Sequence, residues 1–137
     1  NRLGFQASPA STVTLKCANA QNLPAWYDGT PFDAVLADVP CTASGVVKRN
    51  PDIKWLRRPA DALKTARQQE ALLDALWQVL RPGGRMLLAT CSIFQEENES
   101  QLHRFLTRHA DAQCSESHVL IPNGNQDGFY YALIQKQ

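Results

Sequence analysis

Two cysteines lie in short motifs that suit covalent chemistry. Cys41 follows the sequence Asp38-Val39-Pro40, and Cys91 lies between Thr90 and Ser92. Each motif comes directly after a short apolar run of the kind that forms a buried strand. A thiolate is both a strong nucleophile and a metal ligand. Two thiols beside a carboxylate therefore admit three interpretations: a covalent catalytic site, a redox pair or a metal site.

The metal interpretation has the least support. The histidines lie downstream of both motifs and show no ligand spacing: His103, His109 and His118. The cysteines include no Cys-x-x-Cys pair, which argues against a zinc module and a dense disulfide framework. A redox pair usually uses closer spacing than that between Cys41 and Cys91. We expect no metal, and a reducing, cytoplasmic setting.

The elements that must position these motifs alternate between strands and helices. The residue patterns predict a helix end at residues 1–5, strands over 12–17, 33–39, 85–90, 114–121 and 129–134, and helices over 60–80 and 95–109. We expect the strands over 33–39 and 85–90 to be buried, the first of them on both faces. Such alternation predicts an open, mostly parallel α/β sheet with flanking helices. Ligands bind at the carboxyl ends of such strands, where Cys41 and Cys91 should meet.

Several side chains have a structural explanation in this scheme. Apolar residues at helical spacing predict a core stripe on the first long helix: Leu63, Ala66, Leu72, Leu73, Leu76 and Leu80. Cys17 and Cys114 lack motif context, so we expect them in the core. Glu96, Glu97 and Glu99 fit the first turn of the second helix, where the helix dipole favours anions. Asp127 with Gly128 indicates a turn.

Composition limits the remaining possibilities. The 137 residues are 44% hydrophobic, which suits one modest domain. With 14 basic and 13 acidic residues, the chain carries no general basic coat. Basic residues are nevertheless concentrated in one segment, since residues 48–67 hold seven basic and two acidic side chains. No apolar run is long enough to cross a membrane.

Six stretches together resemble successive signatures of the RNA cytosine-C5 methyltransferases: residues 32–45, 51–55, 80–84, 89–92, 96–99 and 127–130. The resemblance covers essentially the whole chain and is closest to the bacterial Sun/Fmu branch, which acts on small-subunit (16S) ribosomal RNA. It implies that residues 1–137 form the C-terminal part of a Rossmann-like class I methyltransferase domain that uses S-adenosylmethionine.

The resemblance also implies roles for individual residues. Cys91 would attack carbon 6 of the target cytosine, and Cys41 would assist release of the methylated product. Asp38 would contact both the cytosine and the methyl donor. The cofactor-binding set would comprise Asn19, Asp38 and Pro40, with Asn19 standing where the family usually has an acidic residue.

Ribosomal RNA is the partner that this resemblance implies. Basic residues beside the Cys41 motif would neutralise RNA phosphates: Lys48, Arg49, Lys54, Arg57 and Arg58. The target base would be unpaired or flipped out of its helix to reach the thiols.

Three alternatives remain open from the sequence: a non-catalytic RNA-binding remnant, methylation of a transfer RNA cytosine, and a thiol redox protein. No glycine-rich methyl-donor loop precedes the Cys41 motif, although the family has one there. We therefore expect this chain alone to bind the cofactor poorly and to be inactive. An exposed sheet edge would also favour dimerisation.

Overall fold

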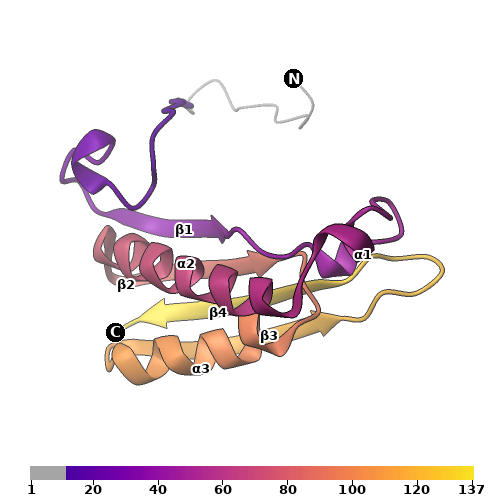
Figure 1. Cartoon of the computed structure of the whole chain (residues 1–137). Helices are drawn as coiled ribbons and strands as arrows, with labels where there is room; N and C mark the ends of the chain where they lie inside the picture. The colour runs from indigo at the N-terminus through magenta and orange to yellow at the C-terminus, as the bar shows by residue number, and fades with distance from the viewer. Residues whose placement is uncertain (1–11) are drawn as a thin grey trace.

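A computed structural model describes residues 12–137, so the helix end expected at residues 1–5 lies outside the described residues. The strands are β1 (Phe32–Asp38), β2 (Leu80–Thr90), β3 (Ala112–Leu120) and β4 (Phe129–Lys136). The helices are α1 (Ile53–Leu56), α2 (Pro59–Gln78) and α3 (Glu99–Arg108), with short 3-10 turns η1 (Leu23–Ala25), η2 (Ser44–Val46) and η3 (Gln95–Glu97). The long helices α2 and α3 lie side by side against the sheet (Figure 1).

The four strands form one sheet in the order β1-β2-β4-β3. β1 pairs in parallel with β2, whereas β4 is antiparallel to both β2 and β3. The predicted α/β class is confirmed, but the expectation of a mostly parallel sheet needs correction. β1, β2 and β3 point the same way, yet two of the three pairings are antiparallel. The reason is that residues 121–128 form a short loop, which returns β4 beside β3 in the opposite direction.

The core lies between the helices and one face of the sheet. Leu73 and Trp77 of α2 and Phe105 of α3 pack on apolar side chains from the strands, chiefly Met86, Leu88, Tyr130, Ala132 and Ile134. Trp77 meets Phe105 edge to face, with 5.1 Å between ring centroids. Such a pair stabilises the packing beyond its buried area. This layer fixes β1 and β2, and so the strand ends that carry the cysteines.

One face of β1 is open, although the strand was expected to be buried on both faces. Leu36 is 68% exposed and Phe32 is 41% exposed. A short apolar run does not distinguish one-sided from two-sided burial, which explains the difference. Among the described residues, β1 pairs with β2 alone and forms an edge of the sheet.

This open edge predicts self-association of the isolated 137-residue chain. Unpaired backbone groups and exposed apolar side chains on an edge strand favour pairing with another copy. We expect a dimeric mass in light scattering, and a shift towards monomer on Leu36→Lys, which places a charge on the exposed strand. A monomer at all concentrations would contradict this expectation. Arg85→Lys, which leaves the apolar surface unchanged, is the control.

The core stripe of α2 agrees only in part with the predicted apolar set. Its buried row is Ala62, Ala66, Gln69, Leu73 and Trp77, whereas Leu63 is 57% exposed. Ala66 and Leu73 are buried as predicted, but the row also includes the polar Gln69, which a pattern of apolar residues does not reveal. Leu72 and Leu76 are partly buried at its margin.

Two other predicted elements are wrong in detail. Residues 12–17 form no strand, because β-branched residues make a strand only where a neighbour supplies hydrogen bonds. Cys17 is accordingly exposed, not packed in the core. The helix predicted over 95–109 is interrupted at Asn98, which separates η3 from α3. Cys114 is partly buried against the core.

Candidate active site

The carboxyl ends of β1 and β2 bring the two cysteine motifs together. Asp38, the last residue of β1, pairs with Ala89 near the end of β2. The loops that follow leave the sheet at the same edge, and the Sγ atoms of Cys41 and Cys91 lie 3.4 Å apart. Both cysteines are half-buried and neither forms a disulfide. The predicted proximity of the two thiols is confirmed.

A glycine holds the loop after Cys41 across the backbone of Cys91. The Gly45 N–H donates to the Cys91 carbonyl at 2.9 Å, and the Gly45 carbonyl accepts from the Gly128 N–H at 2.8 Å. A Cβ at position 45 would lie 2.1 Å from the Gly128 carbonyl oxygen. Only glycine fits this crossing, which joins the ends of β1, β2 and β4.

The contact between the thiols shifts their pKa values in opposite directions. The hydrogen bond to Cys41 lowers the pKa of Cys91 to about 7, although burial and the charges of Asp38 and Glu97 act to raise it. The same contact, together with burial, raises the pKa of Cys41. At neutral pH, Cys91 is therefore partly thiolate, while Cys41 is a neutral donor. Cys91 is the stronger nucleophile of the pair.

Removing Cys41 should raise the pKa of Cys91. In the wild-type protein the Cys91 thiolate is lost as pH falls through about 7. Cys41→Ala removes the largest cause of that low value, so alkylation of Cys91 should require higher pH. The measurement is iodoacetamide labelling across pH, read on the Cys91 peptide by mass spectrometry, with Cys114→Ala as control. An unchanged midpoint would show that the thiol contact does not set the pKa.

A pocket of about 410 Å³ opens beside Cys91 at this sheet edge. Its wall combines the Asp38 carboxylate and the Arg49 guanidinium with apolar and aromatic groups: Leu36, Val46, Ala89, Thr90, Phe129 and Tyr131. The Phe129 and Tyr131 rings are stacked, with 6.1 Å between centroids. Apolar walls with a few polar groups are typical of small-molecule sites. Cys41 lines a separate, smaller pocket of about 200 Å³ together with Arg57, Asp61, Lys64 and Thr65.

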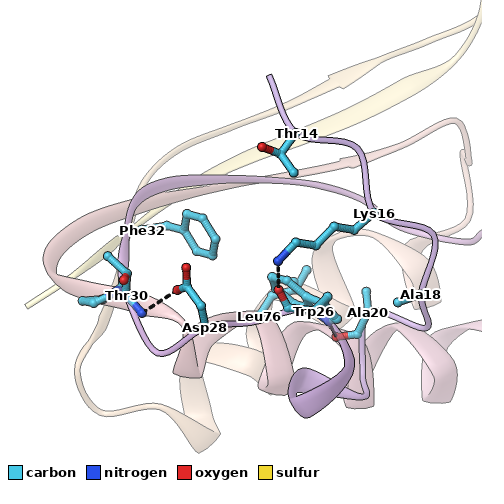
Figure 2. A pocket seen from close by; sticks show the side chains of 10 residues that line it. Thr14, Lys16, Ala18, Ala20, Trp26, Asp28, Thr30, Phe32 and Leu76 are labelled. Carbon is cyan, nitrogen blue, oxygen red and sulfur yellow. Dashed lines mark hydrogen bonds between the residues drawn. The ribbon is translucent and has the colours of Figure 1, made fainter. Parts of the chain in front are cut away.

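A larger pocket lies elsewhere on the molecule. About 610 Å³ in volume, it lies at the start of β1 and includes Phe32, the first residue of that strand. Figure 2 shows that its polar groups already bond to one another: Lys16 reaches the Trp26 carbonyl, and the Thr30 N–H donates to Asp28 at 2.9 Å. The thiols lie beyond the other end of β1, so this pocket is separate from the reactive edge.

The three candidate cofactor residues occupy different positions. Asp38 is exposed and lines the pocket beside Cys91. The Pro40 carbonyl accepts a hydrogen bond from Gln69 of α2 at 3.0 Å, which anchors the loop. The Asn19 side chain accepts from the Gln21 N–H at 3.0 Å and so closes its own turn. Asp38 alone of the three lines this pocket.

Two of the candidate RNA-binding residues hold the site together. The Arg57 Nε donates to the Thr42 carbonyl at 2.8 Å, beside Cys41. Arg49 forms an ion pair with Asp127 at 2.5 Å and lines the Cys91 pocket. Asp127, interpreted from the sequence as part of a turn, therefore also orients a pocket residue.

The other basic candidates extend towards solvent. Lys54 and Arg58 are exposed on either side of the end of α1, and Trp55 between them is 87% exposed. Lys48 is exposed too, and its ammonium group contacts the Gly124 carbonyl. Lys54 and Arg58 are therefore more available to a large anionic partner than Lys48 and Arg57, each of which donates to a backbone carbonyl.

The sequence analysis missed the role of Glu97. This residue is fully buried. Its carboxylate accepts hydrogen bonds from the Thr42 N–H at 2.8 Å and the Thr42 hydroxyl at 2.7 Å, and also from the hydroxyls of Ser92 and Thr65. A signal was present in the sequence, because each motif cysteine is followed by a hydroxyl residue that needs an acceptor.

The neighbouring Asn98 fixes the other side of the Cys91 motif. Its Nδ2 donates to the Ser92 carbonyl at 2.8 Å, and its Oδ1 accepts from the Thr90 hydroxyl at 2.6 Å. Both contacts are buried. They explain why the helix is interrupted at Asn98, since its side chain closes the turn around Cys91.

Within residues 12–137, no three His, Cys, Asp or Glu side chains are grouped closely enough to hold a metal ion. In the same part of the chain, no helix has both the length and the apolar character needed to cross a bilayer.

Comparison with known sequences points to one family. Residues 1–135 match the model of the 16S rRNA methyltransferase RsmB/F family. The ribosomal RNA small subunit methyltransferase B of Erwinia tasmaniensis is 50% identical over 121 residues, which cover 82% of this chain and 28% of that protein. The Vibrio cholerae protein of the same name is 45% identical over 134 residues, or 92% of this chain and 31% of that protein. The chain thus spans under a third of the length of these relatives.

Two solved structures share the fold of this chain. NSun6 from Pyrococcus horikoshii with SFG has a TM-score of 0.77 and 29% identity, covering 90% of this chain and 34% of that chain. A methyltransferase homologue from the same organism has a TM-score of 0.66 and 28% identity, covering 79% of this chain and 40% of that chain. On the sequence match and the shared fold, this chain belongs to the 16S rRNA methyltransferase RsmB/F family.

Proposed function

We propose that residues 1–137 are the C-terminal part of the catalytic domain of an S-adenosylmethionine-dependent methyltransferase. Its substrate is a cytosine of small-subunit ribosomal RNA, which it methylates on carbon 5 through a covalent adduct with Cys91. The observation that carries this proposal is the 3.4 Å contact between the Cys41 and Cys91 thiols at the end of two parallel strands. The names of the curated relatives support ribosomal RNA over transfer RNA as the substrate.

The first step uses the Cys91 thiolate. Carbon 5 of cytosine is a poor nucleophile, and addition of the thiolate to carbon 6 turns the ring into an enamine-like species that attacks through carbon 5. The lowered pKa of Cys91 makes the thiolate available near neutral pH. In this proposal Asp38, in the wall of the same pocket, accepts a hydrogen bond from the amino group of the cytosine.

The second step needs a base, and Cys41 becomes one. Once Cys91 is bonded to carbon 6, its thiolate no longer contacts Cys41, so the largest cause of the raised Cys41 pKa is removed. Cys41 then releases its proton to solvent more readily, and its thiolate accepts the proton from carbon 5, whose electron pair forms the double bond between carbon 5 and carbon 6. The bond between carbon 6 and Cys91 breaks, and its electron pair returns to the Cys91 sulfur. The contact therefore supports our proposal that the two thiols act one after the other in different roles.

The methyl donor fits the same edge of the sheet. Nucleotide-type ligands bind beyond the carboxyl ends of strands in this fold class, where the Asp38 pocket opens. S-adenosylmethionine, when bound, supplies a methyl group on a positively charged sulfur, which an exposed carboxylate attracts. Asn19 and Pro40 complete the proposed cofactor set. We propose that binding and turnover require the full-length protein.

We propose that all five basic candidates contact RNA, and that they contribute differently to RNA binding and to the stability of the site. Lys54→Glu combined with Arg58→Glu should weaken binding of 16S rRNA and reduce the slope of log K against log salt by about one per lost phosphate contact. Exposure of both side chains makes this change harmless to the fold. Arg57→Glu should instead destabilise the Cys41 loop, because it breaks the bond to Thr42.

The measurement is RNA binding by filter retention over a salt series, with Lys16→Glu as a control at a distance from the thiols. Equal affinity and equal salt slope in the double variant and the wild type would remove Lys54 and Arg58 from the RNA surface.

The experiment that tests the function uses the full-length protein, 16S rRNA and methyl-labelled S-adenosylmethionine. The RNA is digested to nucleosides, and labelled 5-methylcytidine is the expected product. Label on another atom or base would overturn the carbon-5 assignment. RNA binding without any methylation would favour a binding module, and label in transfer RNA alone would change the substrate.

A further inference from the structure

The two cysteine motifs share one buried acceptor. Thr42, next to Cys41, donates its hydroxyl to Glu97 at 2.7 Å and its N–H at 2.8 Å. Ser92, next to Cys91, donates its hydroxyl to the same carboxylate. Thr65 of α2 supplies a further hydroxyl. One side chain from η3 therefore connects both cysteine loops and the long helix behind them.

The Glu97 carboxylate is the common partner in these contacts. Four polar groups converge on its two oxygens, and each carboxylate oxygen has more than one lone pair with which to accept hydrogen bonds. Hydrogen bonds to a charged acceptor are about twice as strong as neutral ones. Glu97 has no solvent exposure, so water does not compete for these donors. Its neighbour Glu96 is exposed and leaves the cysteine loops untouched by its side chain.

We propose that Glu97 is a positioning residue that holds the Cys41 and Cys91 loops together and so keeps the two thiols in contact. Its effect on methylation rests on the proposed function, whereas its effect on the thiols does not. Glu97 acts on the cysteines through its hydrogen bonds to Thr42 and Ser92, since each of these residues directly follows a cysteine in the chain. Gly45 and Asn98 restrain the backbone of the Cys91 turn, but neither of them bonds to both the Thr42 and the Ser92 hydroxyl.

The pH dependence of Cys91 distinguishes positioning from a simple charge effect. Cys91 is surrounded by titratable or charged groups from every element that packs around it: Asp38, Cys41, Arg49, Glu97 and Tyr131. The Glu97 charge raises the Cys91 pKa, whereas the Cys41 hydrogen bond lowers it and is the larger cause. Loss of the Glu97 hydrogen bonds that join the two loops should therefore raise the pH midpoint of Cys91 ionisation. Loss of the Glu97 charge alone should lower that midpoint.

The first test compares Glu97→Gln with Glu96→Gln in the full-length protein. A glutamine offers one acceptor oxygen and turns an amide towards the remaining donors, so the loops should separate. We expect the midpoint of Cys91 alkylation to move to higher pH in Glu97→Gln and to stay at the wild-type value in Glu96→Gln. In a Cys41→Ala background, Glu97→Gln should instead lower the pH midpoint of Cys91 alkylation. No thiol contact is then left to lose, so the substitution removes only the negative charge of Glu97.

A second readout measures thiol proximity directly. In a glutathione buffer, oxidised glutathione takes the two electrons as Cys41 and Cys91 lose their protons and form a disulfide. The equilibrium constant gives the effective concentration of one thiol at the other, which we expect to fall at least about tenfold in Glu97→Gln. The Cys41–Cys91 peptide pair is quantified by mass spectrometry, which separates it from Cys17 and Cys114.

A gentler variant keeps the test valid if Glu97→Gln fails to fold. Thr42 is buried, and Thr42→Val keeps its shape while removing the hydroxyl that donates to Glu97. Thr42→Ser retains that hydroxyl and is the matched control. We expect a lower effective thiol concentration and a higher Cys91 midpoint in the valine variant, and values near the wild type in the serine variant.

Methylation provides the last comparison. A displacement of about 1 Å between reacting groups costs about 10²-fold in rate, so Thr42→Val and Glu97→Gln should lower kcat more than they raise KM for RNA. Unchanged thiol equilibrium and unchanged Cys91 midpoint in folded Glu97→Gln and Thr42→Val would overturn the proposal. Altered thiols without any methylation by the wild type would instead keep the positioning role and reject the proposed function.

Discussion

Cys91→Ala should abolish both methylation and the covalent adduct with RNA, whereas Cys41→Ala should let a denaturant-resistant adduct accumulate. Loss of a covalent nucleophile reduces turnover on the order of 10⁴-fold or more. In Cys41→Ala the Cys91 thiolate still adds to carbon 6, although its higher pKa makes this step slower at neutral pH. The carbon-5 proton then lacks its acceptor, and the protein remains bonded to the RNA.

The adduct is measured with full-length protein, S-adenosylmethionine and 16S rRNA on a denaturing gel. Raising the pH should speed adduct formation in Cys41→Ala, because more Cys91 is then ionised. Cys114→Ala on β3 is the control and should behave as the wild type. An adduct in Cys91→Ala that is missing in Cys41→Ala would exchange the two roles. Rapid disulfide formation without any adduct would favour the thiol redox alternative.

Gly45→Ala should disrupt the site from the backbone. The added Cβ would lie 2.1 Å from the Gly128 carbonyl oxygen and 2.9 Å from the Cys91 carbonyl oxygen, and backbone atoms do not yield as side chains do. Overpacking of this kind costs about 1–3 kcal/mol in unfolding free energy. It should also separate the Cys41 loop from the Cys91 turn, so methylation should fall further than the stability loss alone explains.

Thermal unfolding by circular dichroism and the methylation assay check this expectation together. Gly124→Ala is the matched control, because nothing lies within 4 Å of a Cβ at that position. Wild-type stability and activity in Gly45→Ala would mean that the loop relaxes without cost and that the close crossing does not position Cys91.

Local sequence determined much of the fold. The apolar run near residues 33–39 and the helical spacing across 60–80 correspond to β1 and α2 within a few residues. Alternation of strands and helices also predicted the α/β class. These features depend on neighbouring residues along the chain, so periodicity alone reveals them. The meeting of Cys41 and Cys91 followed from one further rule, that parallel strands end at a common edge.

Other features depended on contacts between distant segments. The antiparallel direction of β4 is set by its short link to β3, and the exposure of Leu36 is set by which face the helices cover. Residues 12–17 have strand propensity but lack a partner, so no strand forms. Propensity is a property of a segment, whereas pairing and burial belong to the assembled sheet.

The candidate site also combines features that the local sequence predicts with features that depend on contacts between distant segments. The sequence by itself identified Asp38, Cys41 and Cys91 as the candidates for the chemistry, because of their residue types and their order in the chain. Only the tertiary structure decided how they are held: the Glu97 carboxylate, far from Thr42 in the chain, becomes the common acceptor for both cysteine loops. A buried charge is stable only where several donors converge on it, and that convergence exists only in the folded chain.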